Sequence, residues 1–311
     1  MKNTALSRRL KAIPGGLLLL PMLCGMLLRL LPDSSATIGE PSATLFSSKA
    51  AMCIVGLLLF FSGAQCRFRD IWTGIRRDGP LLLLKLLLNA GMILLFSKFC
   101  KDSSFLGISL IAVAACVSSC NPGLFLGLTT QYGTPADRTC FALLNIISLP
   151  GIAVCLFHLT SGFSFAAAPV LGGILPFALG VLAGACIPSL RSGNTVKLLL
   201  PFLGLSLGCA IDITSLGRQL LPGFLLSLLY LLTNTLPLML TERFVLHRSG
   251  LTSAAACSIA GVSLSVPALI SATEPQGSAA VPDAAAQLAV ALLLTNIAAA
   301  FLAKSAAEKK F

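Results

Sequence analysis

Charged side chains are scarce in this sequence of 311 residues. They make up 11% of the chain, whereas hydrophobic residues make up 56% and the mean hydropathy is +0.92. A soluble domain of this size needs more polar surface than this to cover its core. The composition therefore excludes an ordinary soluble protein and predicts an all-α integral membrane protein whose surroundings are a lipid bilayer.

Histidine and acidic residues are also scarce, with two histidines and 11 Asp and Glu against 22 Lys and Arg. The eleven cysteines are scattered along the chain without ligand-like pairing, so we expect them to pack as small hydrophobic residues rather than form disulfides or a metal site. We find no nucleotide-binding loop and no convincing Ser-His-Asp set. We therefore expect a protein that is not an enzyme, has no cofactor or metal, and does not bind nucleic acid.

Apolar runs separated by charged or turn-forming clusters predict ten transmembrane helices, each of which needs about 20 mostly apolar residues. The predicted spans are 13–31, 50–66, 80–99, 105–130, 139–159, 165–188, 196–211, 220–240, 251–272 and 284–303. If the N-terminus is cytoplasmic, most of the 22 lysines and arginines fall on the cytoplasmic side. This asymmetry predicts a multi-pass protein with both termini in the cytoplasm and an uncleaved first span.

The two halves of the chain resemble each other weakly. The matches align, in order, Gly25 with Gly180, Gly63 with Gly208 and Pro122 with Pro267. Five spans per half is an odd number, so the second half must enter the membrane from the opposite side. We therefore expect two inverted five-helix repeats, residues 1–160 and 161–311, as in carriers that work by alternating access.

The fourth and ninth spans carry helix-interrupting sequences, "SSCNPGLFLG" and "SLSVPALI". The residues expected to break these helices are Pro122, Gly123 and Pro267. Freed backbone groups cannot face lipid, so the two discontinuous helices are expected to cross inside the protein near the midplane. There the helix ends could bind a carboxylate or a cation.

Polar residues near the two breaks are candidate ligands for a polyhydroxylated substrate. The proposed substrate-binding set is Ser118, Ser119, Asn121, Ser263 and Ser265, together with Gln65, which could face the same cavity from the second span. The alternative is that these serines bond the carbonyls of the preceding turn or hold helices together.

A few ionisable residues lie in or near the spans. Asp212 and Thr214, in "IDITS", are candidates for ion coupling, and the alternative is a helix cap. Lys85 lies five residues into its predicted span, so we expect its amine to reach the membrane surface, with a role in binding a substrate carboxylate or an internal ion pair as the alternative.

Several segments together resemble the 2-keto-3-deoxygluconate permease family. They are "AIPGGLLLLP", "NPGLFLGLTTQYGT", "LPFALGVLAG", "LPFLGLSLGCAIDIT" and "GVSLSVPALI", in order over nearly the whole chain. The resemblance implies a carrier of the bacterial inner membrane that takes up a small anionic sugar acid with protons. It also implies the fold of bile-acid and sodium/proton carriers, in which a panel and a core built from interleaved helices move past each other.

The sequence departs from the pattern of this family at two acidic positions, where Ser118 and Ile147 stand instead. The coupling ion, H+ or Na+, is therefore left open. The leading hypothesis is proton symport of 2-keto-3-deoxygluconate or a relative. The alternatives are a sodium-coupled organic-anion carrier and an uncoupled channel or sensor. The oligomeric state is also open, with a homodimer among the options.

Overall fold

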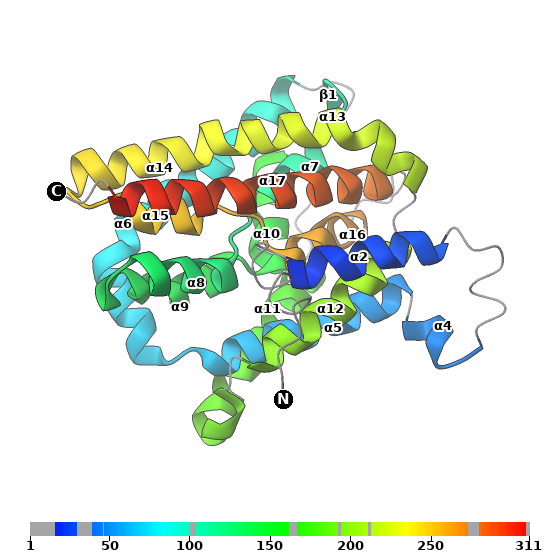
Figure 1. The fold of residues 1–311 in the computed structure, drawn as a ribbon, viewed down its shortest axis with the longest axis horizontal. Helices are drawn as coiled ribbons and strands as arrows, with labels where there is room; N and C mark the ends of the chain where they lie inside the picture. The colour runs from blue at the N-terminus through cyan, green and yellow to red at the C-terminus, as the bar shows by residue number, and fades with distance from the viewer. Residues whose placement is uncertain are drawn as a thin grey trace.

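The computed structural model is almost entirely helical in the residues that it describes, which are 16–29, 39–45, 47–99, 104–161, 167–191, 194–210, 213–272 and 280–308 (Figure 1). The exception is a small antiparallel hairpin of β1 (Ser104–Phe105) and β2 (Ile108–Ser109). The expectation of a helical protein is confirmed.

Helix is found within all ten predicted spans. The α-helices are α2 (Gly16–Arg29), α4 (Ser42–Leu45), α5 (Ser48–Gln65), α6 (Phe68–Phe99), α7 (Leu110–Val117), α8 (Pro122–Tyr132), α9 (Phe141–Ile147), α10 (Pro150–Ser161), α11 (Ala167–Cys186), α12 (Asn194–Ala210), α13 (Ile213–Tyr230), α14 (Leu236–Leu240), α15 (Leu251–Ala256), α16 (Val266–Ser271) and α17 (Val281–Glu308). The 3-10 turns are η1 (Pro135–Cys140), η2 (Pro188–Arg191) and η5 (Gly261–Ser265), and the π-helical turns are η3 (Leu231–Thr235) and η4 (Thr241–Val245).

By length and composition, four helical segments of the described chain can cross a membrane. They are Arg69–Phe99, Leu110–Tyr132, Gly217–Val245 and Val281–Glu308. A fifth crossing is obtained if the pair Ala136–Ile147 and Pro150–Leu159, bent by 63°, counts as one span. The remaining apolar helices are shorter, so a total of ten crossings stays a prediction.

Helix α6 is longer than its predicted span. It begins at Phe68 rather than at Pro80, and Pro80 lies inside the helix. The charged residues before Pro80 led to the prediction that the span begins at Pro80. The helix continues through Pro80 because a single proline removes only one helical hydrogen bond. The consequence is that Lys85 lies in the middle of a 32-residue helix rather than near its end.

Four glycines bring two pairs of helices into close contact. Gly25 of α2 faces Gly208 of α12, and Gly63 of α5 faces Gly180 of α11. At each of the four positions, a Cβ would collide with a backbone carbonyl three residues before the partner glycine. Small residues of this kind allow helix backbones to approach closely within a membrane.

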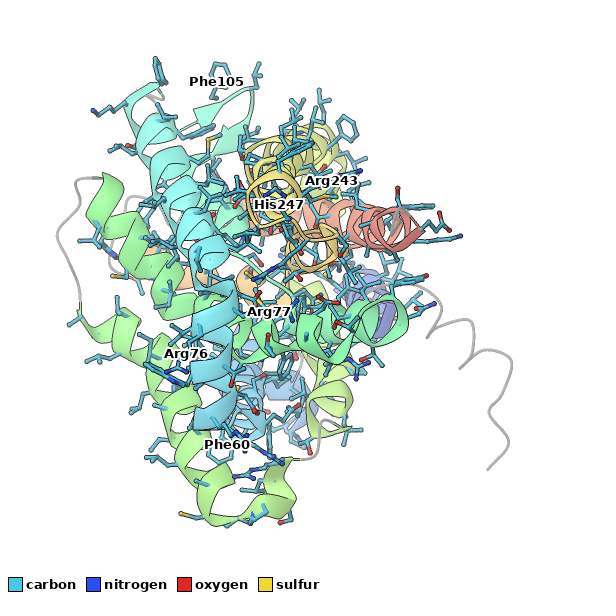
Figure 2. All side chains as sticks on the ribbon, turned by 90° about the vertical axis from the view of Figure 1, so that its left-hand side faces the viewer. Phe60, Arg76, Arg77, Phe105, Arg243 and His247 are labelled. Carbon is cyan, nitrogen blue, oxygen red and sulfur yellow. The ribbon has the colours of Figure 1, made fainter. Side chains whose placement is uncertain are left out.

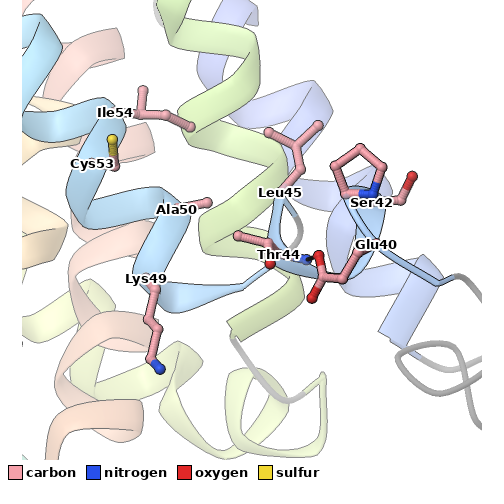
Figure 3. Close-up of a pocket in the computed structure, with 9 residues that line it drawn as sticks. Glu40, Ser42, Thr44, Leu45, Lys49, Ala50, Cys53 and Ile54 are labelled. Atoms are coloured by element: carbon pink, nitrogen blue, oxygen red, sulfur yellow. Dashed lines mark hydrogen bonds between the residues drawn. The ribbon is translucent and has the colours of Figure 1, made fainter.

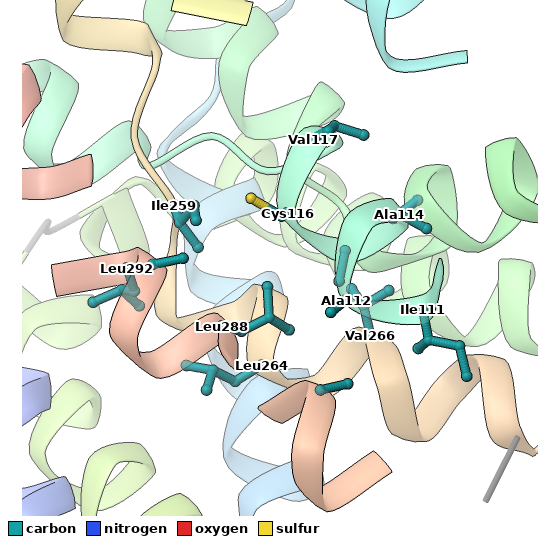
Figure 4. Close-up of a cluster of buried hydrophobic side chains, with 14 of the residues drawn as sticks. Ile111, Ala112, Ala114, Cys116, Val117, Ile259, Leu264, Val266, Leu288 and Leu292 are labelled. Atoms are coloured by element: carbon teal, nitrogen blue, oxygen red, sulfur yellow. The ribbon is translucent and has the colours of Figure 1, made fainter. Parts of the chain in front are cut away.

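The remaining long helices enclose the interrupted ones. Helices α13 and α17 lie side by side across the molecule, and α7 packs against α6, α10 and α17 (Figure 1). Side chains of α7, α16 and α17 meet in the main buried hydrophobic cluster, which includes Ala112, Val266 and Leu288 (Figure 4). The interruptions are therefore held inside packed helices.

The fourth span is interrupted where the sequence predicts, between Val117 and Pro122. The ninth span is interrupted earlier than predicted, over residues 257–260, and Pro267 is the second residue of α16. The assignment of Pro267 as the breaking residue was therefore wrong. Proline is tolerated in the first turn of a helix, because the N–H it lacks would have no partner there.

A third interruption separates α9 from α10, just before Pro150. The sequence predicts one continuous span over residues 139–159. The residue before a proline disfavours the helical conformation, which explains why α9 ends at Ile147 and the chain bends by 63°.

Candidate functional site

The two interrupted spans touch each other at their breaks. The Oγ atom of Ser119 accepts a hydrogen bond from the backbone N–H of Ala260 at 2.9 Å. The hydroxyl of Ser263 donates to the same Oγ at 2.6 Å. The amide of Asn121 also donates to the carbonyl of Ile259, at 3.5 Å. We call this arrangement the crossing, meaning residues 118–121 and 257–263.

The polar residues of the crossing are removed from solvent. Ser118, Ser119 and Ser263 are 1 to 3% exposed. Irregular backbone that is buried in this way needs partners within the protein, and the serine hydroxyls provide some of them. The crossing is thus a buried polar region rather than an open cleft.

Asn121 has two structural roles. Its Oδ1 accepts the N–H of Leu124 at 3.1 Å, which caps the first turn of α8, while its Nδ2 reaches Ile259 across the crossing. Pro122 and Gly123 follow as the first residues of α8, where proline is favoured. The positive end of the α8 dipole therefore begins at the crossing.

Lys85 lies fully buried beside the crossing. Its Nζ is 3.3 Å from the hydroxyl of Tyr230 and 3.3 Å from Oδ1 of Asn234, and it sits over the Tyr230 ring at 5.0 Å from the centroid. The Tyr230 hydroxyl in turn donates to the carbonyl of Ser119 at 3.1 Å. The expectation that Lys85 reaches the membrane surface is wrong, because α6 extends well beyond it in both directions.

Several buried polar atoms in the two breaks and in the neighbouring helices α6, η3 and α17 have no hydrogen-bond partner in the protein. They include Oγ of Ser118 and of Ser258 in the two breaks, Nδ2 of Asn234, and both amide atoms of Asn89 and Asn296. Buried polar groups are nearly always satisfied by protein, water or ligand. The segments around the crossing therefore hold unused hydrogen-bonding capacity.

Two of the predicted site residues bond within their own helical turns. Gln65 donates to the carbonyl of Phe61, and Ser265 to that of Val262. Their hydrogen bonds thus follow the alternative reading of helical side chains bonded to the preceding turn. Asp212 lies outside the described residues, and Thr214 lies in the first turn of α13 with its side chain outside them.

A second polar cluster joins α6, η1 and the segment between η4 and α15. Asp78, which is buried, accepts from Arg248 at 2.9 Å and from the hydroxyl of Thr139 at 3.0 Å. Arg77 pairs with Asp137 at 2.8 Å. Figure 2 labels Arg77 on α6. We call these five residues the charged cluster.

The charged cluster lies near two ends of the interrupted spans. Asp137 follows α8, and Arg248 precedes α15. Glu242, fully buried in η4, accepts the N–H groups of Thr252 and Ser253 at 3.2 and 2.6 Å and so holds the start of α15. If the N-terminus is cytoplasmic, the ten predicted spans place all of these connecting segments on the cytoplasmic side, but the sequence did not predict that their charges pair.

Two surface hollows lie away from the crossing. One, of about 600 Å³, is formed by α4 and the start of α5 and is lined by residues such as Leu45, Lys49 and Ile54 (Figure 3). The other lies between η3, α14 and α17 and is lined almost entirely by apolar side chains. Neither is lined by residues of the crossing. Across the described part of the chain, no three His, Cys, Asp or Glu side chains are grouped as metal ligands.

The chain matches known transport proteins over nearly its full length. A family model described as 2-keto-3-deoxygluconate permease matches residues 7–310. A 2-keto-3-deoxygluconate permease of Xanthomonas axonopodis pv. citri is 30% identical over 293 residues, which is 92% of each chain. One of Pectobacterium carotovorum is 29% identical, covering 91% of this chain and 90% of the relative, and one of Escherichia coli is 27% identical, covering 94% and 91%.

A solved structure shares the fold. The sodium proton antiporter MjNhaP1 of Methanocaldococcus jannaschii superimposes with a TM-score of 0.64 over 98% of this chain and 94% of its own, at 15% identity. At this identity the likeness concerns the fold alone. The family match and the permease relatives identify a membrane transport protein and not an enzyme.

Proposed function

Because the chain belongs to the 2-keto-3-deoxygluconate permease family, we propose that it imports 2-keto-3-deoxygluconate or a close relative by proton symport across the bacterial inner membrane. The observation that carries this proposal is the buried crossing, where two interrupted helices meet in hydrogen-bonded polar groups. Such crossings are typical of substrate and ion sites in secondary transporters.

The proposed architecture is ten membrane segments in two inverted five-helix repeats, residues 1–160 and 161–311. The four close-packed glycines support it. The sequence matches align Gly25 with Gly180 and Gly63 with Gly208, so exchanging the repeats turns the contact of Gly25 with Gly208 into that of Gly180 with Gly63. Both contacts have the same carbonyl geometry, as a two-fold relation within the membrane would require.

In this proposal the substrate binds where the two breaks meet. The hydroxyls of Ser118, Ser119 and Ser263 and the amide of Asn121 would bond the sugar hydroxyls, and the start of α8 would favour the negative charge. The crossing is buried, so in this proposal a substrate reaches it only after helices have moved apart. Alternating access then requires helices to separate on one side at a time.

The charged cluster is the proposed closing layer on the cytoplasmic side. It joins α6 to the segments that follow α8 and precede α15, so these elements cannot separate without breaking the pairs of Asp78 with Arg248 and of Arg77 with Asp137. Opening toward the cytoplasm would expose these four side chains to water. Both termini are proposed to lie on this side.

Proton coupling remains assigned to Asp212 and Thr214. Sodium coupling is the second candidate, because the solved neighbour of this fold is named as a sodium proton antiporter. An uncoupled channel or sensor is the third. A homodimer is compatible with each of these functions.

Uptake into proteoliposomes tests the proposal. Purified protein with labelled 2-keto-3-deoxygluconate outside and an inward proton gradient should accumulate the label above its outside concentration, and a protonophore should abolish the excess. Accumulation that needs sodium instead of the proton gradient would favour the second candidate. Equilibration that never exceeds the outside concentration would rule out symport.

A further inference from the structure

We propose that Lys85 binds the carboxylate of the transported sugar acid and thereby selects acids over neutral sugars. This inference rests on the proposed function, and the sequence alone offered it only as an alternative for Lys85. It follows from a charge that the fold buries without an opposite charge beside it.

The position of Lys85 is fixed by three groups on the opposite helix. Tyr230 offers its hydroxyl and its ring face, and Asn234 offers its amide oxygen. Asn234 lies in the π-helical turn η3, a distortion that is frequent at functional sites. The amine is thus aimed from the middle of α6 toward η3, with Tyr230 continuing the contact to Ser119 at the first break.

No carboxylate pairs with Lys85 in the described residues. The ion pairs found there join Arg77, Arg248 and Lys304 to acidic partners. Removing an ammonium group from water without a counter-charge is costly, and neutral acceptors offset that cost only in part. When an anion binds beside such a buried ammonium group, the ion pair offsets the desolvation free energy of that group.

The partners of Lys85 also leave it free to bind. An ammonium group has three N–H donors, and the two hydrogen bonds made here are long, at 3.3 Å each. Nδ2 of Asn234 and both amide atoms of Asn89, one turn farther along α6, have no protein partner. One cation next to unused amide groups matches a ligand with one carboxylate and several oxygen atoms.

The chemistry of the site therefore favours a monocarboxylate that bears hydroxyl or keto groups. The carboxylate would lie against Lys85, and the polar carbon chain would extend along Tyr230 toward Ser119 and Asn121. A neutral sugar would leave the ammonium group unpaired, and a dicarboxylate would bring a second charge with no cation described beside it.

The test compares an acid with its neutral ester in equilibrium binding to detergent-purified protein. Wild-type protein should bind 2-keto-3-deoxygluconate about 10- to 100-fold more tightly than its methyl ester, as expected for a charge-assisted contact. Lys85→Gln should lose most of that preference by weakening acid binding while leaving ester binding nearly unchanged. Lys85→Arg should restore part of it.

The matched control is Lys98→Gln, an exposed lysine on the same helix. It should leave both affinities unchanged. Equal losses for acid and ester in Lys85→Gln would show a merely structural role and overturn the inference. If that variant does not fold, the affinities of the wild-type protein for the acid and the ester are the test. Equal affinities would also overturn the inference.

Failure of the proposed function gives a different result. Wild-type protein that binds neither the acid nor the ester would overturn the substrate assignment and this inference with it. Wild-type protein that binds the acid tightly, with an unchanged acid preference in Lys85→Gln, would overturn the role of Lys85 alone.

Discussion

Ser119→Ala is predicted to weaken the contact between the two interrupted spans. The Ser119 hydroxyl oxygen is the acceptor for both the N–H of Ala260 and the hydroxyl of Ser263. The serine at 263 can rotate to another acceptor, but the buried N–H of Ala260 cannot. Leaving such a donor without a partner costs about 1–3 kcal/mol, so we expect the free energy of unfolding to fall by that amount.

Ser265→Ala is the matched control for this substitution. Ser265 is also buried near the crossing, but its hydroxyl only donates to the carbonyl of Val262 in its own turn. Its removal leaves no N–H without a partner, and we expect a loss below about 1 kcal/mol. Both variants can be compared by equilibrium unfolding with SDS in dodecylmaltoside micelles. Equal losses in the two variants would refute the assignment of Ser119 as the link between the breaks.

Three further predictions test other contacts of the structure. Asn121→Ala should lower the free energy of unfolding by about 1 kcal/mol, because the cap of α8 is lost, and should abolish uptake. Asn121→Asp should keep the cap. Wild-type uptake by the alanine variant would contradict a role of Asn121 in transport. Gly208→Ala should lower the thermal unfolding temperature, because the new Cβ would collide with α2. Gly56→Ala is the control and should leave this temperature unchanged, because there is open space around Gly56. Equal unfolding temperatures for the two variants would contradict the close packing of α2 and α12. Asp78→Asn should remove the negative charge that pairs with Arg248 and so increase the labelling, from the cytoplasmic side, of a cysteine placed in the charged cluster. Unchanged labelling in membrane vesicles would argue against a closing layer.

The first break could be predicted because its signals are local. Asn121, Pro122 and Gly123 are adjacent in the chain, and cap, helix start and interruption all follow from their backbone preferences. The second break was predicted as a feature but misplaced, because Pro267 was read as an interruption when it only begins a helix. Sequence signals of this kind fix the presence of a break more firmly than its position.

The contacts between distant segments could not be predicted in the same way. Lys85 and Tyr230 are 145 residues apart, and Asp78 and Arg248 are 170 residues apart. A lysine in an apolar run has the same local pattern whether it reaches the membrane surface or faces a tyrosine on another helix. Only the packing of α6 against α13 and η3 separates the two cases.

The predicted repeat spacing contained part of this information. Lys85 and Tyr230 differ by 145, the same spacing that aligns Gly63 with Gly208 and Pro122 with Pro267. If the two halves are inverted repeats, as proposed, equivalent positions can meet near the symmetry axis between them. A polar residue at both members of such a pair, inside apolar spans, is therefore a usable signal for the centre of a site.

The central claim is that the crossing of the two interrupted spans is the site of the sugar acid. An experimental structure of the protein with bound 2-keto-3-deoxygluconate tests it most directly. We expect ligand density between Lys85 and Asn121, with the carboxylate next to the amine of Lys85 and the hydroxyl groups toward Ser119. Ligand density confined to the hollow beside α4 and α5, with the hydrogen bonds of the crossing unchanged, would contradict a substrate site at the crossing.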